Sequence, residues 1–159
     1  MITKQKSKNI IILIVALLLL ICFAFLIPNL TNIENTYQKS LNSKSFIETI
    51  FMFLVFAAIE TLIAQALICE IILSFKFLKS LKNIVVILLS STSFGFLHYD
   101  SSISSSNFIV IFYFLTGIIF AFIYLYFRKY GIMKSIIITT SFHFWVNICL
   151  YLIDLLELS

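Results

Sequence analysis

The sequence predicts an all-α fold, a polytopic membrane helix bundle of about five transmembrane helices with a cytoplasmic N-terminus. Hydrophobic residues make up 62% of its 159 residues and charged residues only 11%, whereas a soluble domain averages about 45–50% apolar and about 25% charged residues. Apolar stretches about as long as a bilayer is thick alternate with short polar segments. With 3 Gly and 1 Pro, the chain also lacks the turn-forming residues of a β-sandwich, a Rossmann domain or a disordered chain. The composition therefore indicates an integral membrane protein.

Five apolar stretches are expected to form the transmembrane helices. They are residues 10–27, 46–75, 84–98, 108–127 and 132 to about 156. A spanning segment must satisfy its backbone hydrogen bonds internally, and these stretches are too long and too uniform to be barrel strands. Helices are therefore expected for all five.

The stretches differ in length, and their lengths indicate how the chain is divided into units. The first exceeds the apolar core of a signal peptide, about 7–15 residues, and no A-x-A cleavage site follows it, so we expect a retained anchor. The second is longer than the roughly 20 residues that cross a bilayer, so it must tilt or protrude. The third is short, and a polar loop over 99–107 separates it from the fourth. We expect two units, an N-terminal anchor helix with a polar loop over residues 1–45 and a four-helix intramembrane core over residues 46–159.

The positive charges give the expected orientation. Two of them, Lys39 and Lys44, fall on one side of a five-pass layout. The other nine fall on the opposite side: Lys4, Lys6, Lys8, Lys76, Lys79, Lys82, Arg128, Lys129 and Lys134. Because Lys and Arg are enriched in cytoplasmic loops, this bias predicts a cytoplasmic N-terminus and an external C-terminus. It also accounts for the net charge of +4 without a nucleic acid partner, so the expected surroundings are the lipid bilayer.

Glu60 is the most informative polar residue, because it lies near the middle of the second stretch. A charge at the bilayer centre costs roughly 2.5–3.5 kcal/mol even on insertion scales, and no Lys or Arg lies within a helical turn of Glu60. The carboxyl group therefore needs a partner from another helix or a bound proton. A structural carboxyl group that bridges helices is the alternative to a functional one.

The only two histidines also belong to apolar stretches. His98 closes the third stretch, and His143 lies inside the fifth, where Asn147 shares its helical face at the i+4 position. A single membrane histidine commonly serves to hydrogen-bond two helices. Two histidines, one Asn and Glu60 on three helices form a set, however, which we expect to face one polar cavity.

Other polar residues have simpler interpretations. Glu70 is expected near the interface, close to Lys76. Thr61 and Gln65 share a helical face and are expected to hydrogen-bond within the bundle. The small polar residues at 90–93 and 139–141 are expected to let helices approach closely.

In this order and on successive predicted helices, Glu60, Phe94-x-x-x-His98 and His143-x-x-x-Asn147 resemble the CPBP (Abi) intramembrane proteases. That family includes the CAAX prenyl endopeptidases and bacterial proteins linked to bacteriocin processing and self-immunity. Its three motifs read Glu-Glu-x-x-x-Arg, Phe-x-x-x-His and His-x-x-x-Asn. The resemblance covers about residues 56–150 and implies a CPBP-like core in a bacterial plasma membrane, crossed several times.

The first motif departs from the family pattern. Thr61 stands in place of the second Glu, and Gln65 stands in place of the Arg. In the family motif this Glu and Arg, four residues apart, could form an ion pair. Loss of both members of the pair leaves no unpaired buried charge, whereas loss of only one would be strongly destabilising. By resemblance, four residues carry the chemistry: Glu60, His98, His143 and Asn147. Three others are expected to bind substrate or support the site: Thr61, Gln65 and Phe94.

The resemblance implies peptide hydrolysis by an activated water molecule, without a cofactor. Glu60 would act as general base, with His98 holding the water. His143 would donate, with Asn147, hydrogen bonds to the developing oxyanion, an effect of about 3–4 kcal/mol per donor. The substrate would be a small peptide or a membrane-anchored protein. Glu60, His98 and His143 are also three potential zinc ligands, but the sequence contains no His-Glu-x-x-His, and the resemblance points to a metal-free site.

Two alternatives stay open at this point. The altered first motif is also compatible with a catalytically silent relative, an immunity or scaffold protein that binds a membrane protein partner. A transporter or channel subunit is a third hypothesis, although inverted repeats and helices broken by Gly or Pro are missing from the sequence. The charge bias places His98 near the outer end of the third stretch, whereas CAAX processing in the family is cytosolic, so the sequence leaves the accessible face open.

Overall fold

The computed structural model describes residues 45–75, 81–99 and 106–157. The predicted first transmembrane stretch, residues 10–27, lies outside these ranges, as does almost all of the predicted N-terminal unit. The number of about five spans and the cytoplasmic N-terminus therefore stay predictions.

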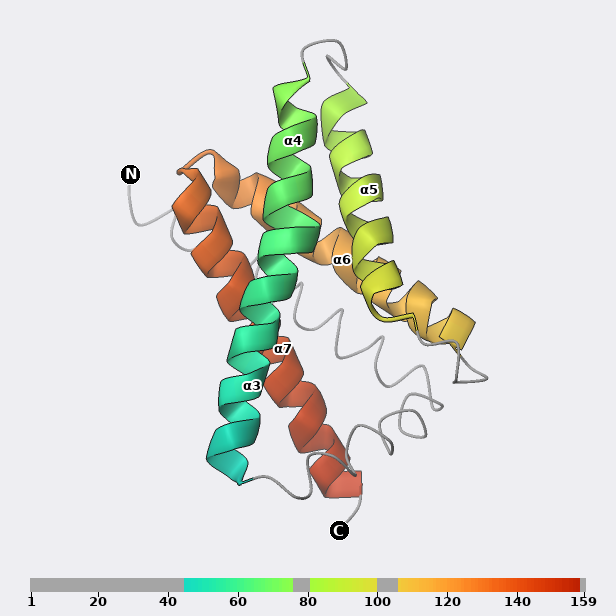
Figure 1. Ribbon diagram of the computed structural model, residues 1–159, viewed down its shortest axis with the longest axis vertical. Coiled ribbons are helices and arrows are strands. Elements are labelled where there is room, and N and C mark those ends of the chain that lie inside the picture. The colour runs from blue at the N-terminus through green and yellow to red at the C-terminus, as the bar shows by residue number, and fades with distance from the viewer. Residues whose placement is uncertain (1–44, 76–80, 100–105, 158–159) are drawn as a thin grey trace, which may run out of the picture.

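Within the described ranges the chain is all-helical, which confirms the predicted fold class (Figure 1). The first rod is a continuous run of three elements, and three single helices follow: α3 (Phe46–Glu60), η1 (Thr61–Leu67) and α4 (Ile68–Ser74), then α5 (Lys82–Leu97), α6 (Ser106–Arg128) and α7 (Ile132–Glu157). Three segments are long and apolar enough to cross a membrane: Phe46–Ser74, Val110–Arg128 and Ile132–Leu152. Helix α5 is a shorter apolar helix.

Local sequence determines where several helices begin and end. Ser45 and Glu48 form a capping box at the start of α3, with Ser45 N donating to Glu48 Oε2 at 2.7 Å and Glu48 N donating to Ser45 Oγ at 3.3 Å. Gly131 lies between α6 and α7 with φ of 116°, a conformation that residues with a Cβ rarely adopt. Its amide donates to the Arg128 carbonyl at 3.1 Å, which closes the tight turn.

Helices α5 and α6 approach so closely that glycine is required at two points. A Cβ on Gly117 would lie 2.8 Å from Ser91 Cα, and a Cβ on Gly95 would lie 2.9 Å from the Val110 carbonyl oxygen. Ser90 and Ser91 are fully buried at this contact, as predicted for small residues. Ser90 Oγ also donates to the Ala64 carbonyl at 2.7 Å, and this bond joins α5 to η1.

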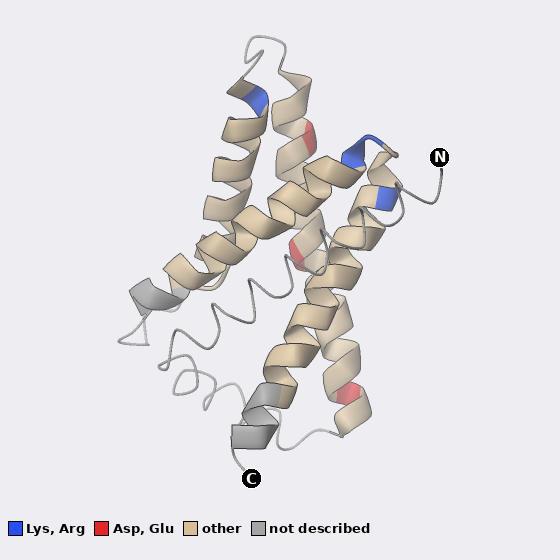
Figure 2. Ribbon diagram, turned by 180° about the vertical axis from the view of Figure 1, so that it is seen from behind, with Lys and Arg blue, Asp and Glu red and all other residues tan. Residues whose placement is uncertain are grey.

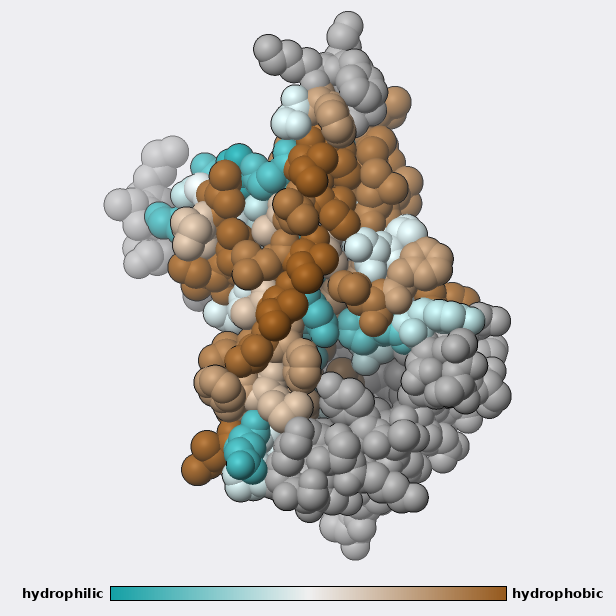
Figure 3. Space-filling view, viewed as in Figure 1, coloured by the Kyte–Doolittle hydropathy of each residue, from teal (hydrophilic) through white to brown (hydrophobic). Residues whose placement is uncertain are grey.

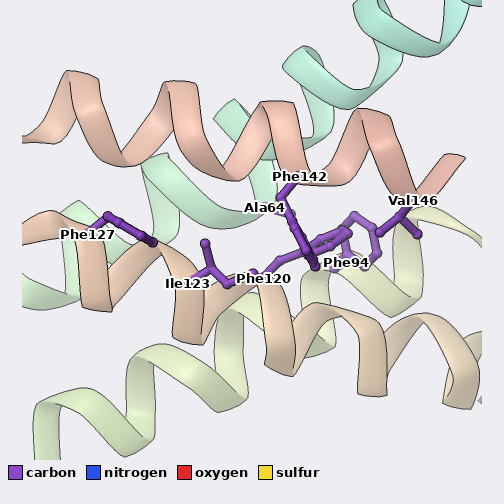
Figure 4. Packing of buried hydrophobic residues seen from close by; sticks show 7 residues of the cluster. All are labelled: Ala64, Phe94, Phe120, Ile123, Phe127, Phe142 and Val146. Atoms are coloured by element: carbon purple, nitrogen blue, oxygen red, sulfur yellow. The ribbon is translucent and has the colours of Figure 1, made fainter. Parts of the chain in front are cut away.

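The interior consists of closely packed aromatic and aliphatic side chains. One cluster joins the first rod, α5, α6 and α7 (Figure 4): Ala64, Phe94, Phe120, Ile123, Phe127, Phe142 and Val146. Lipid tails are as apolar as these side chains, so the cluster stabilises the bundle by close packing rather than by removal from water. The outer surface is correspondingly hydrophobic, and a hydrophilic patch interrupts it near mid-height (Figure 3).

The charges of the described part are unevenly distributed along the bundle (Figure 2). Lys and Arg gather near one end, where α4 and α6 end and α5 and α7 begin. The glutamates are instead spread along the rod from α3 to α4. The described cations Lys82, Arg128, Lys129 and Lys134 therefore lie on the same side, as the charge bias predicts, and the assignment of that side to the cytoplasm stays a prediction.

Candidate active site

Three helices bring Glu60, His98 and His143 together. Oε2 of Glu60 lies 3.4 Å from Nε2 of His143 and 3.7 Å from Nε2 of His98. The three residues come from the end of α3, the end of α5 and the middle of α7. The expected convergence of these side chains is therefore observed, while their catalytic roles stay predictions.

The short length of α5 explains how its last residue reaches the centre of the bundle. A helix rises about 1.5 Å per residue, so the 16 residues of α5 extend about 24 Å. Measured from the same basic end, Glu60 lies about 21 Å along the first rod. His98 caps α5 at its C-terminus and so lies at the level of Glu60, near mid-height rather than at the outer surface.

His98 is held on two sides. Its Nδ1 lies 2.9 Å from the Phe94 carbonyl oxygen, which can only accept, so Nδ1 carries the proton and Nε2 keeps its lone pair. The ring stacks on Tyr113 with centroids 3.5 Å apart and planes inclined by 13°. At 3.7 Å, Nε2 and the Glu60 oxygen are too far apart for a direct hydrogen bond. A water molecule between them can donate one hydrogen to each.

His143 lies deeper than the other two residues. Its side chain is 3% exposed, whereas those of Glu60 and His98 are 22% and 20% exposed. The His143 ring packs against Phe120, with centroids 4.5 Å apart, and against Phe94 at 5.4 Å. This group of three residues is therefore accessible at Glu60 and His98, whereas aromatic rings cover it at His143.

Phe94, predicted as a supporting residue, is the centre of the aromatic packing. It is fully buried, and its ring contacts both histidines, with centroids 4.9 Å from His98 and 5.4 Å from His143. Asn147 lies one helical turn beyond His143 on the same face of α7 and is half-buried. The described structure gives Asn147 no hydrogen bond to Glu60, so the fourth predicted residue borders the group without being bonded into it.

Thr61 and Gln65 are fully buried, but the expected hydrogen bonds within the bundle are not observed. Among the described residues, Thr61 Oγ1 and both amide atoms of Gln65 lack a partner. Both residues belong to η1, which is π-helical. Glu60 and Gln65 are five residues apart, which would place them about 140° apart around an α-helix. A π turn contains more residues than an α turn, so it reduces this angle and brings Gln65 closer to the helical face of Glu60. Such turns are frequent at functional sites.

Sequence reasoning missed Tyr113 and Phe120, whose rings contact the two histidines. Both lie on α6 in a chain with 18 Phe and 7 Tyr, so no local signal distinguishes them from packing residues. Their proximity to the histidines follows from the close approach of α6 to α5.

A second carboxylate, Glu70, lies further along the first rod. Its Oε1 accepts hydrogen bonds from Tyr124 Oη, at 2.9 Å, and from Arg128 Nε, and its Oε2 accepts from Arg128 Nη2 at 2.8 Å. Glu70 thus forms a bidentate ion pair with α6, whereas its expected proximity to Lys76 concerns a residue outside the described ranges.

Within the described ranges, no group of three or more acidic, histidine or cysteine side chains is arranged to hold a metal ion. The expectation of a site without metal stays a prediction.

Comparison with known families identifies a family for most of the chain. The model of a family described as type II CAAX prenyl endopeptidase Rce1-like matches residues 42–149, more than half of the chain. The match includes Glu60, His98, His143 and Asn147. No curated protein and no solved structure was found to match the chain.

Proposed function

Because the chain belongs to the type II CAAX prenyl endopeptidase Rce1-like family, a family of membrane proteases, we propose that it is a glutamate-type intramembrane endopeptidase. Its substrate is a small peptide or a membrane-anchored protein. The observation that carries the proposal is the approach of Glu60 Oε2 to Nε2 of two histidines from two other helices, at 3.4 and 3.7 Å.

In the proposed reaction, a water molecule donates its hydrogens to Glu60 and to His98 Nε2. Its oxygen attacks the carbonyl carbon of the scissile peptide bond while Glu60 takes the proton. The oxyanion accepts a hydrogen bond from His143 Nε2 and, in the substrate complex, from the Asn147 amide. Glu60 then passes the proton to the leaving amine as the C–N bond breaks, which returns the carboxylate to its first state.

The exposure of the three side chains supports this division of roles. Glu60 and His98 are partly accessible and can meet water and substrate, whereas His143 is buried in an aromatic environment. Removal of water around a hydrogen-bond donor strengthens its interaction with a developing negative charge. We place the protein in a bacterial plasma membrane, with the bilayer and its peptide substrate as partners and without nucleic acid.

A second candidate function is supported by Thr61 and Gln65. These replace a Glu and an Arg of the first family motif, and their side-chain polar atoms have no partner among the described residues. A catalytically silent immunity or scaffold protein that binds a membrane protein partner would tolerate these changes. The experiment below distinguishes the two functions.

The test compares membrane-associated peptides in cells that carry the wild-type protein, Glu60→Gln or Glu70→Gln at matched expression. Glu70→Gln is the matched control, because it also removes a carboxylate from the first rod. We expect a precursor to accumulate with Glu60→Gln and with neither of the others, as measured by mass spectrometry. If all three profiles agree, while deletion of the gene still changes the phenotype of the cells, the protein acts by contact rather than by cleavage.

A further inference from the structure

Two buried polar atoms on α7 lack a hydrogen-bond partner in the described structure: Thr139 Oγ1 and His143 Nδ1. Thr139 is fully buried and His143 is 2% exposed. Residues four apart lie on the same helical face, with Cβ atoms about 5–6 Å apart. An unsatisfied buried polar group is destabilising, so a hydrogen bond that satisfies both atoms is favoured.

The Thr139 hydroxyl differs from two other buried hydroxyl groups of the bundle. Thr116 Oγ1 donates to the Phe112 carbonyl at 3.0 Å, and Ser91 Oγ donates to the Ile87 carbonyl at 2.6 Å. Both use the backbone of their own helix, which is the common arrangement for Ser and Thr. Thr139 makes no such bond, so its hydrogen is available to a side chain.

The ring of His143 presents Nε2 to Glu60, with Nε2 lying 3.4 Å from Glu60 Oε2. With its hydrogen on Nε2, His143 can donate to the carboxylate or, in the proposed reaction, to the oxyanion. A neutral imidazole has one N–H, and the other nitrogen must then accept. The proton stays on Nε2 when a donor satisfies Nδ1.

We propose that Thr139 is a positioning residue for His143, because its hydroxyl donates to Nδ1 and thereby keeps the proton on Nε2. A rotation of Thr139 or one bridging water molecule closes the gap between the two atoms. The two histidines of the site then have opposite tautomers, with Nδ1–H in His98 and Nε2–H in His143. The consequence for catalysis rests on the proposed function, whereas the tautomer does not.

The tautomers can be measured directly, because the chain contains 2 His. Full-length protein with ¹⁵N-labelled histidine, in detergent micelles, gives one pair of imidazole nitrogen signals per residue, and His98→Gln assigns them. We expect the Nε2–H tautomer for His143 in the wild type. Thr139→Val, which removes the hydroxyl at nearly equal volume, should convert it to Nδ1–H or to a mixture, and Thr139→Ser should restore it.

Two control variants sharpen the result. Thr116→Val removes a buried hydroxyl that bonds to its own helix, and it should leave both histidine spectra unchanged. Gln65→Met removes another unpartnered buried donor near the site and should also leave the His143 tautomer unchanged. The proposal is overturned if His143 is Nδ1–H in the wild type, or if Gln65→Met rather than Thr139→Val changes its tautomer. If Thr139→Val does not fold, Thr139→Ala, which also removes the hydroxyl, takes its place in the same comparison with Thr139→Ser.

Turnover gives a second readout. With a substrate identified from the accumulated precursor, Thr139→Val should lower kcat about 10–100-fold, as loss of a partner that orients a functional histidine typically does, with KM unchanged. Thr139→Ser should recover most of kcat, whereas a merely structural defect would not be rescued in this way. Failure of Glu60→Gln to abolish turnover would refute the proposed function and leave the tautomer result standing.

Discussion

Glu60 and Glu70 lie on the same helical rod, and the structure gives their carboxyl groups different surroundings. Both oxygens of Glu70 are bonded, to the Arg128 guanidinium and to the Tyr124 hydroxyl. Glu60 instead faces the Nε2 atoms of His98 and His143 at 3.7 and 3.4 Å. The Glu70 carboxylate is thus neutralised by a cation, whereas the Glu60 carboxyl group faces imidazole nitrogens in an aromatic environment.

This difference separates a carboxyl group that is fully paired from one that can accept a further hydrogen-bond partner. A carboxylate in a bidentate pair with Arg has its lone pairs occupied and its charge compensated, so it joins helices and is a poor proton acceptor. Glu60 has partners that orient it without occupying all of its lone pairs, so it can accept a proton from water. Four predictions test this contrast, in order of decreasing expected effect.

Glu60→Gln should lower kcat by about 10²–10⁴-fold, the range of a general base, with no loss of thermal stability. The reason is that the amide keeps the shape of the side chain and cannot accept the proton. Turnover of the identified substrate and the melting temperature in detergent are the two measurements. Full activity in this variant would remove Glu60 from the chemistry.

His143→Phe should lower kcat by about 10²–10³-fold, the usual effect of losing one oxyanion donor. The substitution keeps a ring against Phe94 and Phe120 but removes both nitrogens. His143→Gln, which retains an N–H donor, is the matched control and should lose less. Equal losses in the two variants would argue against a donor role.

Gly117→Ala should lower both stability and kcat. A Cβ there would lie 2.8 Å from Ser91 Cα and 3.1 Å from Phe94 Cβ, so α5 must shift, at a cost of about 1–3 kcal/mol. Phe94 contacts both histidines, and its displacement should disturb the site. Gly131→Ala is the control: a Cβ meets nothing within 4 Å there, and only the φ of +116° opposes it. Thermal melting should therefore show destabilisation in both variants, and turnover per folded molecule should fall only in Gly117→Ala.

Glu70→Gln should lower the free energy of unfolding by about 1–2 kcal/mol and leave kcat unchanged. Hydrogen bonds to charged groups contribute about 1.5–3 kcal/mol, and partial exposure of the pair reduces this value. Arg128→Gln in the same chain should recover part of the loss, since it removes the unpaired cation. A drop in kcat with unchanged stability would show that Glu70 also serves the reaction.

The sequence predicted the helices well because their signals are local. The apolar stretches 46–75, 84–98, 108–127 and 132–156 correspond to Phe46–Ser74, Lys82–Leu97, Ser106–Arg128 and Ile132–Glu157. Apolar content and length suffice here, because any segment that crosses a bilayer must satisfy its own backbone hydrogen bonds. The family motifs likewise identified Glu60, His98 and His143 before their distances were known.

The details of the site could not be predicted in the same way. Thr61 and Gln65 were expected to hydrogen-bond within the bundle, and their side-chain polar atoms have no partner among the described residues. Glu70 was expected near the interface, and its ion-pair partner is Arg128, 58 residues away in the chain. Thr139 was expected only to pack, whereas its unpaired hydroxyl lies one helical turn from His143.

By itself the sequence determined that this protein is a membrane helix bundle and which residues are able to do chemistry in it. Only the tertiary structure decided which carboxyl group is paired with a cation and which faces two histidines. The physical reason is that the two features depend on contacts at different separations along the chain. Helix formation in a bilayer depends on neighbouring residues along the chain, whereas the partner of a polar side chain is determined by which other helix packs against it.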